Sequence, residues 1–260
     1  MRDAETTGSF GGPGVLLMCG VMAGLVGGLL GIGGGIVLIP MLTAWAGFDQ
    51  HSAHGTGIVA VAITALVGVV VYGRGEAIDV AAALQITIVA LPATIVAARF
   101  SPRVSAARLR RIFGLFVIVV ALILPFRDVL GGGDFLLGGG MPVMLVLGAA
   151  SGVISGLLGV GGGSVLVPGL VLITGFPQQL AQGTSLAVIL PSSGAGALAH
   201  ARIGQVRGRL LPPILVGTFA GAWAGGAAAL ALPGQTLRII FSVVLLFMGV
   251  RFVLRERSAR

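Results

Sequence analysis

Two glycine-rich stretches hold the residues whose types and spacing point most directly to chemistry. They read GLLGIGGGIVLIP at residues 28–40 and GLLGVGGGSVLVP at residues 156–168. Three adjacent glycines are costly inside a helix, because glycine loses the most backbone entropy when it is fixed. Unwound backbone in lipid is tolerated only where it is buried in protein or lines a cavity. Breaks at corresponding positions of two halves are typical of a transporter's binding site, although close helix contacts between small residues are the alternative.

The chemistry that such a break favours is anion binding. A helix that starts at the glycines presents free backbone N–H groups and the positive end of its dipole. Two such starts, near Gly35 and Gly163, would converge into an anion site in a low dielectric. The predicted substrate-binding residues are Gly33, Gly34, Gly35, Thr56, Gly161, Gly162, Gly163, Ser164, Gln182, Thr184 and Ser185.

A second repeated motif, AHGT at residues 53–56 and AQGT at residues 181–184, follows each glycine stretch. Thr56 and Thr184 fit two roles equally well, as helix caps or as hydroxyl donors to a ligand. His54 is a candidate proton-linked residue, and a solvated or capping histidine is the alternative.

The acidic residues favour an anionic substrate. All eight of them fall outside the apolar runs, whereas cation sites and proton pumps usually place carboxylates inside the membrane. Proton coupling would then have to pass through a histidine or through the substrate itself.

An intramembrane serine hydrolase is the alternative from a different class of protein. Ser164 and His200 have the residue types for it, but Ser164 corresponds to Ile36 in the other glycine stretch. HExxH, Walker A and CxxC motifs are absent and Cys19 is alone, so we expect no catalytic residue, metal or cofactor.

Composition identifies the class of protein. Of the 260 residues 56% are hydrophobic and 9% are charged, and the mean hydropathy is +1.08, which is typical of a polytopic membrane protein. All sixteen basic residues are arginines at the ends of apolar runs. The positive charge therefore fits the positive-inside rule and not nucleic-acid binding.

The chain consists of two similar halves, and each half must position one glycine stretch and one AxGT motif. Eleven of the seventeen residues at 24–40 are identical to those at 152–168. We expect a disordered tail (1–14), a first transmembrane repeat (15–127), a glycine- and aspartate-rich connector (128–140), a second repeat (141–254) and a basic tail (255–260). The predicted helices are 15–30, 36–47, 55–72, 78–98, 110–126, 141–158, 164–175, 183–200, 210–232 and 237–254.

Arginine placement predicts that the two repeats have opposite orientations. The loop at 99–111 has five arginines, whereas its counterpart at 227–239 has one. We expect 48–54, 99–109, 201–209 and both termini in the cytoplasm. Each repeat would combine three transmembrane helices with a glycine-broken hairpin, which is either re-entrant or a pair of tilted crossings.

The pattern GxGGGxxxxP followed by AxGT, present twice, resembles the sulfite exporter TauE/SafE family of membrane permeases. The likeness covers residues 15–254 and is fullest in the second half, for example at 161–163, 183–186 and 204–206. The resemblance implies transport of small sulfur-containing anions such as sulfite or an organosulfonate. We therefore expect an all-α secondary transporter in the cytoplasmic membrane of a prokaryote, with an anion channel as the alternative. The sequence leaves open whether the protein forms a homo-oligomer.

Overall fold

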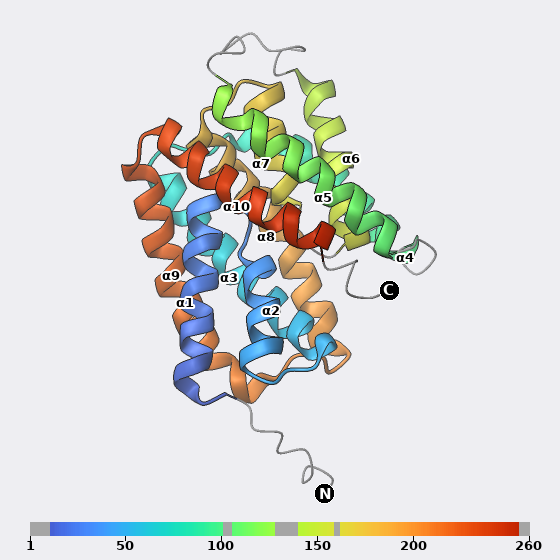
Figure 1. Ribbon diagram of the computed structural model, residues 1–260, viewed down its shortest axis with the longest axis vertical. Coiled ribbons are helices and arrows are strands. Elements are labelled where there is room, and N and C mark those ends of the chain that lie inside the picture. The colour runs from blue at the N-terminus through green and yellow to red at the C-terminus, as the bar shows by residue number, and fades with distance from the viewer. Residues whose placement is uncertain (1–10, 101–105, 128–139, 159–161, 255–260) are drawn as a thin grey trace, which may run out of the picture.

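The computed structural model describes residues 11–100, 106–127, 140–158 and 162–254, and these residues form an all-helical fold (Figure 1). The predicted connector at 128–140 and the tails at 1–14 and 255–260 fall largely outside the described residues. Helices of the first half are α1 (Pro13–Leu30), α2 (Gly35–Trp45), α3 (Gln50–Arg74), α4 (Val80–Phe100) and α5 (Ala106–Ile123), which continues as the 3₁₀ turn η2 (Leu124–Phe126). Helices of the second half are α6 (Met141–Leu158), α7 (Gly163–Ile173), α8 (Gln178–Arg202), the 3₁₀ turn η3 (Gly208–Leu210), α9 (Leu211–Ala231) and α10 (Gly234–Leu254).

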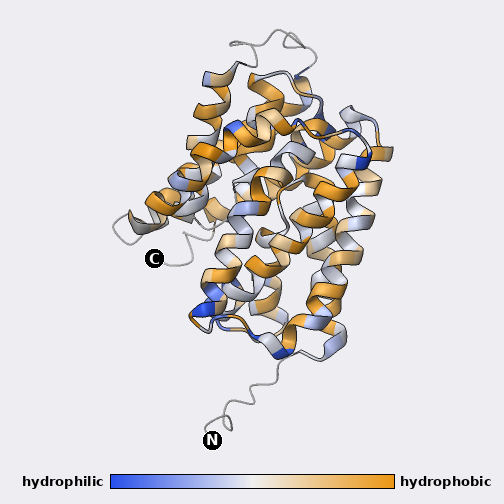
Figure 2. Ribbon diagram, turned by 180° about the vertical axis from the view of Figure 1, so that it is seen from behind, coloured by the Kyte–Doolittle hydropathy of each residue, from blue (hydrophilic) through white to orange (hydrophobic). Residues whose placement is uncertain are grey.

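The helices have the length and surface of membrane spans. Within the described residues, five segments are long and apolar enough to cross a membrane, namely Pro13–Leu30, Gln50–Arg74, Val80–Ala98, Gly208–Ala231 and Gly234–Leu254. Large apolar side chains such as Ile88, Val146 and Phe247 are about two-thirds exposed, as expected for side chains that face lipid. Hydrophobic residues follow most of the length of the bundle, and hydrophilic residues gather at its ends (Figure 2). The prediction of a polytopic membrane protein is confirmed.

Glycines allow two pairs of helices to pack with their backbones in contact. A Cβ on Gly20 of α1 would lie 2.3 Å from the Ile214 carbonyl oxygen of α9. A Cβ on Gly148 of α6 would lie 2.6 Å from the Ile86 carbonyl oxygen of α4. Both contacts join residues that correspond at the repeat offset, so α1–α9 and α6–α4 are equivalent pairs. Packing of small residues at this spacing is a common means of association between membrane helices.

The remaining helices complete the bundle around these pairs. α3 packs against α8, and α5 packs against α10. α5 and α10 lie obliquely across one face of the bundle (Figure 1). The short helices α2 and α7 begin at the ends of the two glycine stretches, at Gly35 and Gly163.

Two helix starts differ most from the sequence prediction. α3 begins at Gln50 and α8 at Gln178, each five residues before the predicted start. Asp49 caps α3 by accepting the Ser52 N–H at 3.0 Å, and Pro177 precedes α8. Gly55 and Gly183 suggested boundaries, but both lie inside helices, where they allow close contact with a neighbouring loop.

Candidate functional site

The first glycine turn has a backbone that requires glycine. Gly31, Gly33 and Gly34 have φ values of +71°, +82° and +75°, in the left-handed region that side-chain-bearing residues rarely adopt. α2 then begins at Gly35. The turn ends α1 and restarts the chain as α2 within four residues, as predicted for a broken helix.

The second glycine turn meets the first. α7 begins at Gly163, where a Cβ would lie 2.8 Å from Ile32 Cα and 2.9 Å from the Gly31 carbonyl oxygen. The start of α7 therefore lies in direct backbone contact with the first turn. Ile189 of α8 borders both of them, because Cβ positions on Gly33 and Gly163 fall within 4 Å of its side chain. Gly161, also predicted to bind substrate, lies outside the described residues.

A buried amide group lies beside the first turn. Gln182 is fully buried, and its Cα would lie 2.7 Å from a Cβ on Gly31. The Tyr72 hydroxyl lies 3.1 Å from Gln182 Oε1 and 2.9 Å from the Gly28 carbonyl oxygen. The Gln182 Nε2 atom has no hydrogen-bond partner in the structure. A buried donor without a partner is costly and marks a place where a ligand oxygen would be stabilising.

Ser185 ties the same turn to α8. Its hydroxyl donates to the Gly31 carbonyl oxygen at 2.9 Å. The predicted residues Gln182 and Ser185 thus both contact the first glycine turn, although they belong to the other half of the chain. Tyr72, the chain's single tyrosine, was missed, and its place within an apolar run was a usable signal, because a buried tyrosine hydroxyl needs a partner.

Thr56 and Thr184 do not cap helices, because each lies two turns inside its helix. Thr184 Oγ1 accepts the Asp79 N–H at 3.0 Å, and Thr56 Oγ1 accepts the Arg207 N–H at 3.2 Å. Gly55 and Gly183, which precede these threonines, leave space for the same two loops. A Cβ on Gly183 would lie 2.0 Å from the Ala77 carbonyl oxygen, and one on Gly55 would lie 2.6 Å from the Gln205 carbonyl oxygen. We call these paired interactions the Gly–Thr contacts; each holds a loop of the opposite half.

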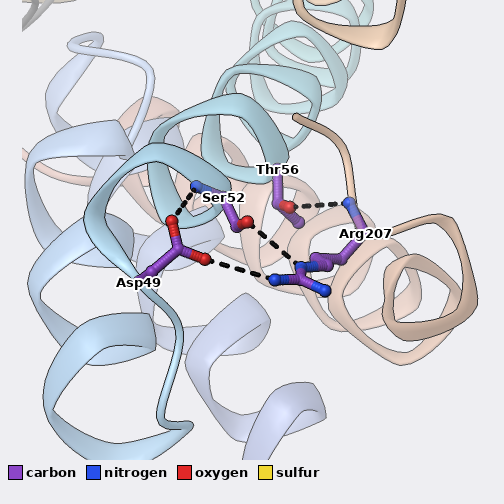
Figure 3. Close-up of polar contacts among 4 residues, drawn as sticks. All are labelled: Asp49, Ser52, Thr56 and Arg207. Atoms are coloured by element: carbon purple, nitrogen blue, oxygen red, sulfur yellow. Dashed lines mark hydrogen bonds and ion pairs between the residues drawn. The ribbon is translucent and has the colours of Figure 1, made fainter. Parts of the chain in front are cut away.

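One of these contacts belongs to a polar network at the end of the bundle (Figure 3). Arg207 donates to Ser52 Oγ at 3.1 Å and to Asp49 Oδ2 at 3.3 Å. The Ser52 N–H, helped by the Ser52 hydroxyl and by Arg207, holds the pKa of the Asp49 carboxyl below its usual range. The segments predicted to share the cytoplasmic side, 48–54 and 201–209, therefore lie together.

His54 lies at this end of the bundle too. Its ring is 5.3 Å from the ring of His200, edge to face, and His200 Nδ1 is 2.6 Å from Gln205 Oε1. The structure thus groups two histidines from α3 and α8, away from the glycine turns. His200 does not approach Ser164, because Gly163 contacts Ile189 and His200 lies about 16 Å further along α8.

These features define a class of protein: an all-helical membrane protein with broken helices whose turns meet inside the bundle. Comparison with known families identifies it further. The model of the family described as Sulfite exporter TauE/SafE matches residues 16–252, so this chain belongs to that family and is a membrane transporter. The family and the names of its relatives favour a permease over an enzyme.

Relatives with similar length carry similar names. The probable membrane transporter protein YunE of Bacillus subtilis (strain 168) is 26% identical over 264 residues, covering 92% of this chain and 96% of the relative. A probable membrane transporter protein of Xylella fastidiosa (strain Temecula1) is 26% identical over 256 residues, covering 93% and 95%. The probable membrane transporter protein MJ0441 of Methanocaldococcus jannaschii is 26% identical over 197 residues, covering 72% and 71%. No solved structure matches the chain.

Proposed function

We propose that this protein is a secondary transporter that moves a small oxyanion, sulfite or an organosulfonate, by alternating access. The observation that carries the proposal is the contact between the glycine turns beside Gln182. The N-terminal ends of α2 and α7 supply backbone N–H groups there, and Gln182 Nε2 supplies a buried donor without a partner. The oxygens of an oxyanion would accept hydrogen bonds from these N–H groups and from Gln182 Nε2.

The charge distribution supports an anion of low charge. No aspartate or glutamate lies within any helix that the structure describes. Each helix N-terminus contributes about 0.3–1 kcal/mol near a surface and about 2 kcal/mol when partly buried. Two such ends without an arginine favour binding that is weak enough for release, as transport requires.

The proposed orientation is that of two inverted repeats. Corresponding contacts recur at the same offset in both halves, including the Gly–Thr contacts and the α1–α9 and α6–α4 pairs. The arginine distribution predicts opposite orientations for those halves. Halves of this kind enclose a site that opens to each side in turn.

Ligand-induced thermal stabilisation of the purified protein tests the proposal. Sulfite, thiosulfate, sulfoacetate and taurine are compared at equal ionic strength, with choline as the cation. We expect at least one of the oxyanions to raise the unfolding temperature. Gly162→Ala should abolish that rise, because it adds a methyl group at the N-terminal end of α7, where the proposed anion binds.

Gly194→Ala is the matched control. It places a methyl group on α8 where nothing lies within 4 Å, so stabilisation by the anion should persist. Uptake into proteoliposomes under an imposed ion gradient then separates a transporter, which concentrates the anion, from a channel. Equal stabilisation of wild type and Gly162→Ala would place the anion site elsewhere.

A further inference from the structure

A groove lies on the outside of the bundle between α2 and the second half of α10, which are neighbours on the face shown in Figure 1. Its volume is about 290 Å³. Apolar side chains of both helices line it, and Arg251 is the single charged residue among the described residues of the lining. Ala44, Trp45 and Phe247 are exposed, so the groove opens to the surface of the bundle.

The corresponding face in the second half is covered by protein. Eight of the eleven residues of α7 are buried, whereas four of the eleven residues of α2 are buried. Leu124 of η2 belongs to the same hydrophobic cluster as Val167 of α7. Its counterpart at the repeat offset, Phe252, lines the groove instead. The groove is therefore a place where α2 lacks a cover that α7 has.

One end of the groove is basic. The side chain of Arg251 is exposed and has no ion-pair partner among the described residues. The start of α5 lies beside this end of α10, because a Cβ on Gly114 would lie 3.0 Å from the Gly249 carbonyl oxygen. The exposed Arg111 lies about one turn before Gly114. After α10 the sequence continues with three more arginines, at 255, 257 and 260.

We propose that this groove binds an acyl chain of an anionic phospholipid, with the headgroup phosphate at Arg251. The apolar lining matches the chain, and the guanidinium matches the phosphate. The volume is near the lower limit for ligand pockets, which suits one slender chain. Basic pockets between transmembrane helices on the cytoplasmic side bind anionic headgroups in other membrane proteins.

Other occupants fit the groove less well. The chain's own tails, 1–10 and 255–260, are mostly polar or charged in sequence and do not match an apolar lining. A second copy of the chain would bring apolar helices, but no aspartate or glutamate lies within any described helix to pair with Arg251. Covering this arginine without a partner would be costly. A lipid supplies both the apolar chain and the negative charge.

The groove reaches the candidate anion site. Ile36 and Val37 line it, and they directly follow Gly35 at the start of α2. A bound acyl chain would therefore contact the first turn of one of the two helices assigned to the anion. Any effect of the lipid on anion binding, and its place in the cytoplasmic leaflet, rest on the proposed function and orientation. Lipid binding itself does not.

Native mass spectrometry of the purified full-length protein tests the charged end of the groove. The probes are phosphatidylglycerol and, as the neutral lipid, phosphatidylcholine with the same acyl chains. We expect wild type to bind one phosphatidylglycerol more tightly than phosphatidylcholine. Arg251→Gln should weaken phosphatidylglycerol binding about fivefold, as expected for one arginine near an anionic lipid, and remove the preference. Arg209→Gln is the matched control, because Arg209 is exposed and does not line the groove.

Ala44→Leu tests the apolar part of the groove. Ala44 is exposed, and its counterpart at the repeat offset is Leu172, so the variant carries the residue of α7 and should fold. The larger side chain fills part of the groove, so both lipids should bind more weakly. Ala227→Leu is the matched control, because it adds the same side chain at an exposed position of α9 that does not line the groove.

The outcomes separate the lipid site from the transport proposal. Phosphatidylglycerol binding that both controls keep, and that Arg251→Gln and Ala44→Leu weaken, supports the site even if no sulfur oxyanion binds the protein. Equal affinities of Arg251→Gln and Arg209→Gln would overturn the proposal, as would wild-type binding by Ala44→Leu. A dimer that excludes lipid and that Ala44→Leu dissociates would show a second copy in the groove and overturn it too.

Discussion

The backbone N–H of Asp79 lies 3.0 Å from Thr184 Oγ1, and this bond joins the two halves of the chain. Its counterpart joins Arg207 to Thr56 at 3.2 Å. Residues 79 and 207 correspond at the repeat offset, as residues 56 and 184 do, so each half holds the loop of the other in the same way. The AxGT motif therefore has a structural role that is independent of any ligand.

Thr184→Val should lower the unfolding temperature, because the Asp79 N–H would lose its acceptor in a partly buried position. The expected cost is about 1–3 kcal/mol. Thr64→Val serves as the control, since it removes only a bond to the preceding turn of its own helix. A Thr184→Val protein as stable as the wild type would contradict this role, and an additional loss of anion binding would show that the hydroxyl also reaches the ligand.

Gly34→Ala and Gly162→Ala should have different effects. Gly34 has φ +75°, and a Cβ there would lie 2.3 Å from the Ala23 carbonyl oxygen, so the substitution strains the backbone and forces the turn apart. The left-handed conformation alone costs an alanine about 1–2 kcal/mol. Gly162 has φ −70° and more space, so its alanine variant should unfold near the wild-type temperature. Thermal unfolding without ligand measures both, and equal destabilisation would contradict the difference between the two turns.

Asp49→Asn should remove a pH-dependent part of the stability. Hydrogen bonds from Ser52 and Arg207 depress the pKa of Asp49 in the folded protein. Its contribution is therefore complete above the unfolded-state pKa, near 4, and is lost as the pH falls below that value. The carboxyl is half exposed, so salt should weaken the effect. The difference in unfolding temperature between wild type and variant should be constant near pH 6 and should narrow as the pH falls from about 4 to about 3.

His54→Gln should flatten any pH dependence of transport that the protein itself supplies, because glutamine occupies the corresponding position, 182. The substrate for this experiment is a sulfonate whose charge is constant across the pH range. Proteoliposome uptake is measured between about pH 5 and pH 8, where an ordinary histidine changes charge. If wild type and variant keep the same pH profile, another group titrates, and His200, which contacts His54, is the next to be changed.

Cysteines placed in corresponding loops should react from opposite sides of the membrane. Glu76→Cys and Ile203→Cys introduce exposed thiols into the loops after α3 and α8, in a background where the buried Cys19 is replaced by alanine. The arginines near Ile203 predict labelling of that site from the cytoplasm and of residue 76 from outside. Labelling of both sites from the same side would refute the inverted orientation.

The helices could be predicted from the sequence because apolar runs of defined length dominate it. The predicted segments 141–158 and 164–175, for example, appear as Met141–Leu158 and Gly163–Ile173. The glycine triplets were correctly placed at helix breaks. The starts of α3 and α8 were missed, because Gly55 and Gly183 were interpreted as boundaries although they provide space for neighbouring loops.

Side-chain partners were less predictable, since they depend on residues far apart in the sequence. Thr56 and Arg207 are separated by 151 positions, and Tyr72 and Gln182 by 110. A local pattern identifies a threonine near a helix start as a cap, and only the packing of α3 against α8 shows which loop it meets.

The distance along the chain between Thr56 and Arg207 has a consequence for biogenesis. When α3 enters the bilayer during synthesis, the loop that Thr56 must hold has not yet been translated. Arg207 follows 151 residues later, so the first Gly–Thr contact forms only after α8 has been inserted. Until then, Gly55 and Thr56 of the nascent first half have no loop to bind. The two halves therefore dock in a late step, after their helices have been inserted.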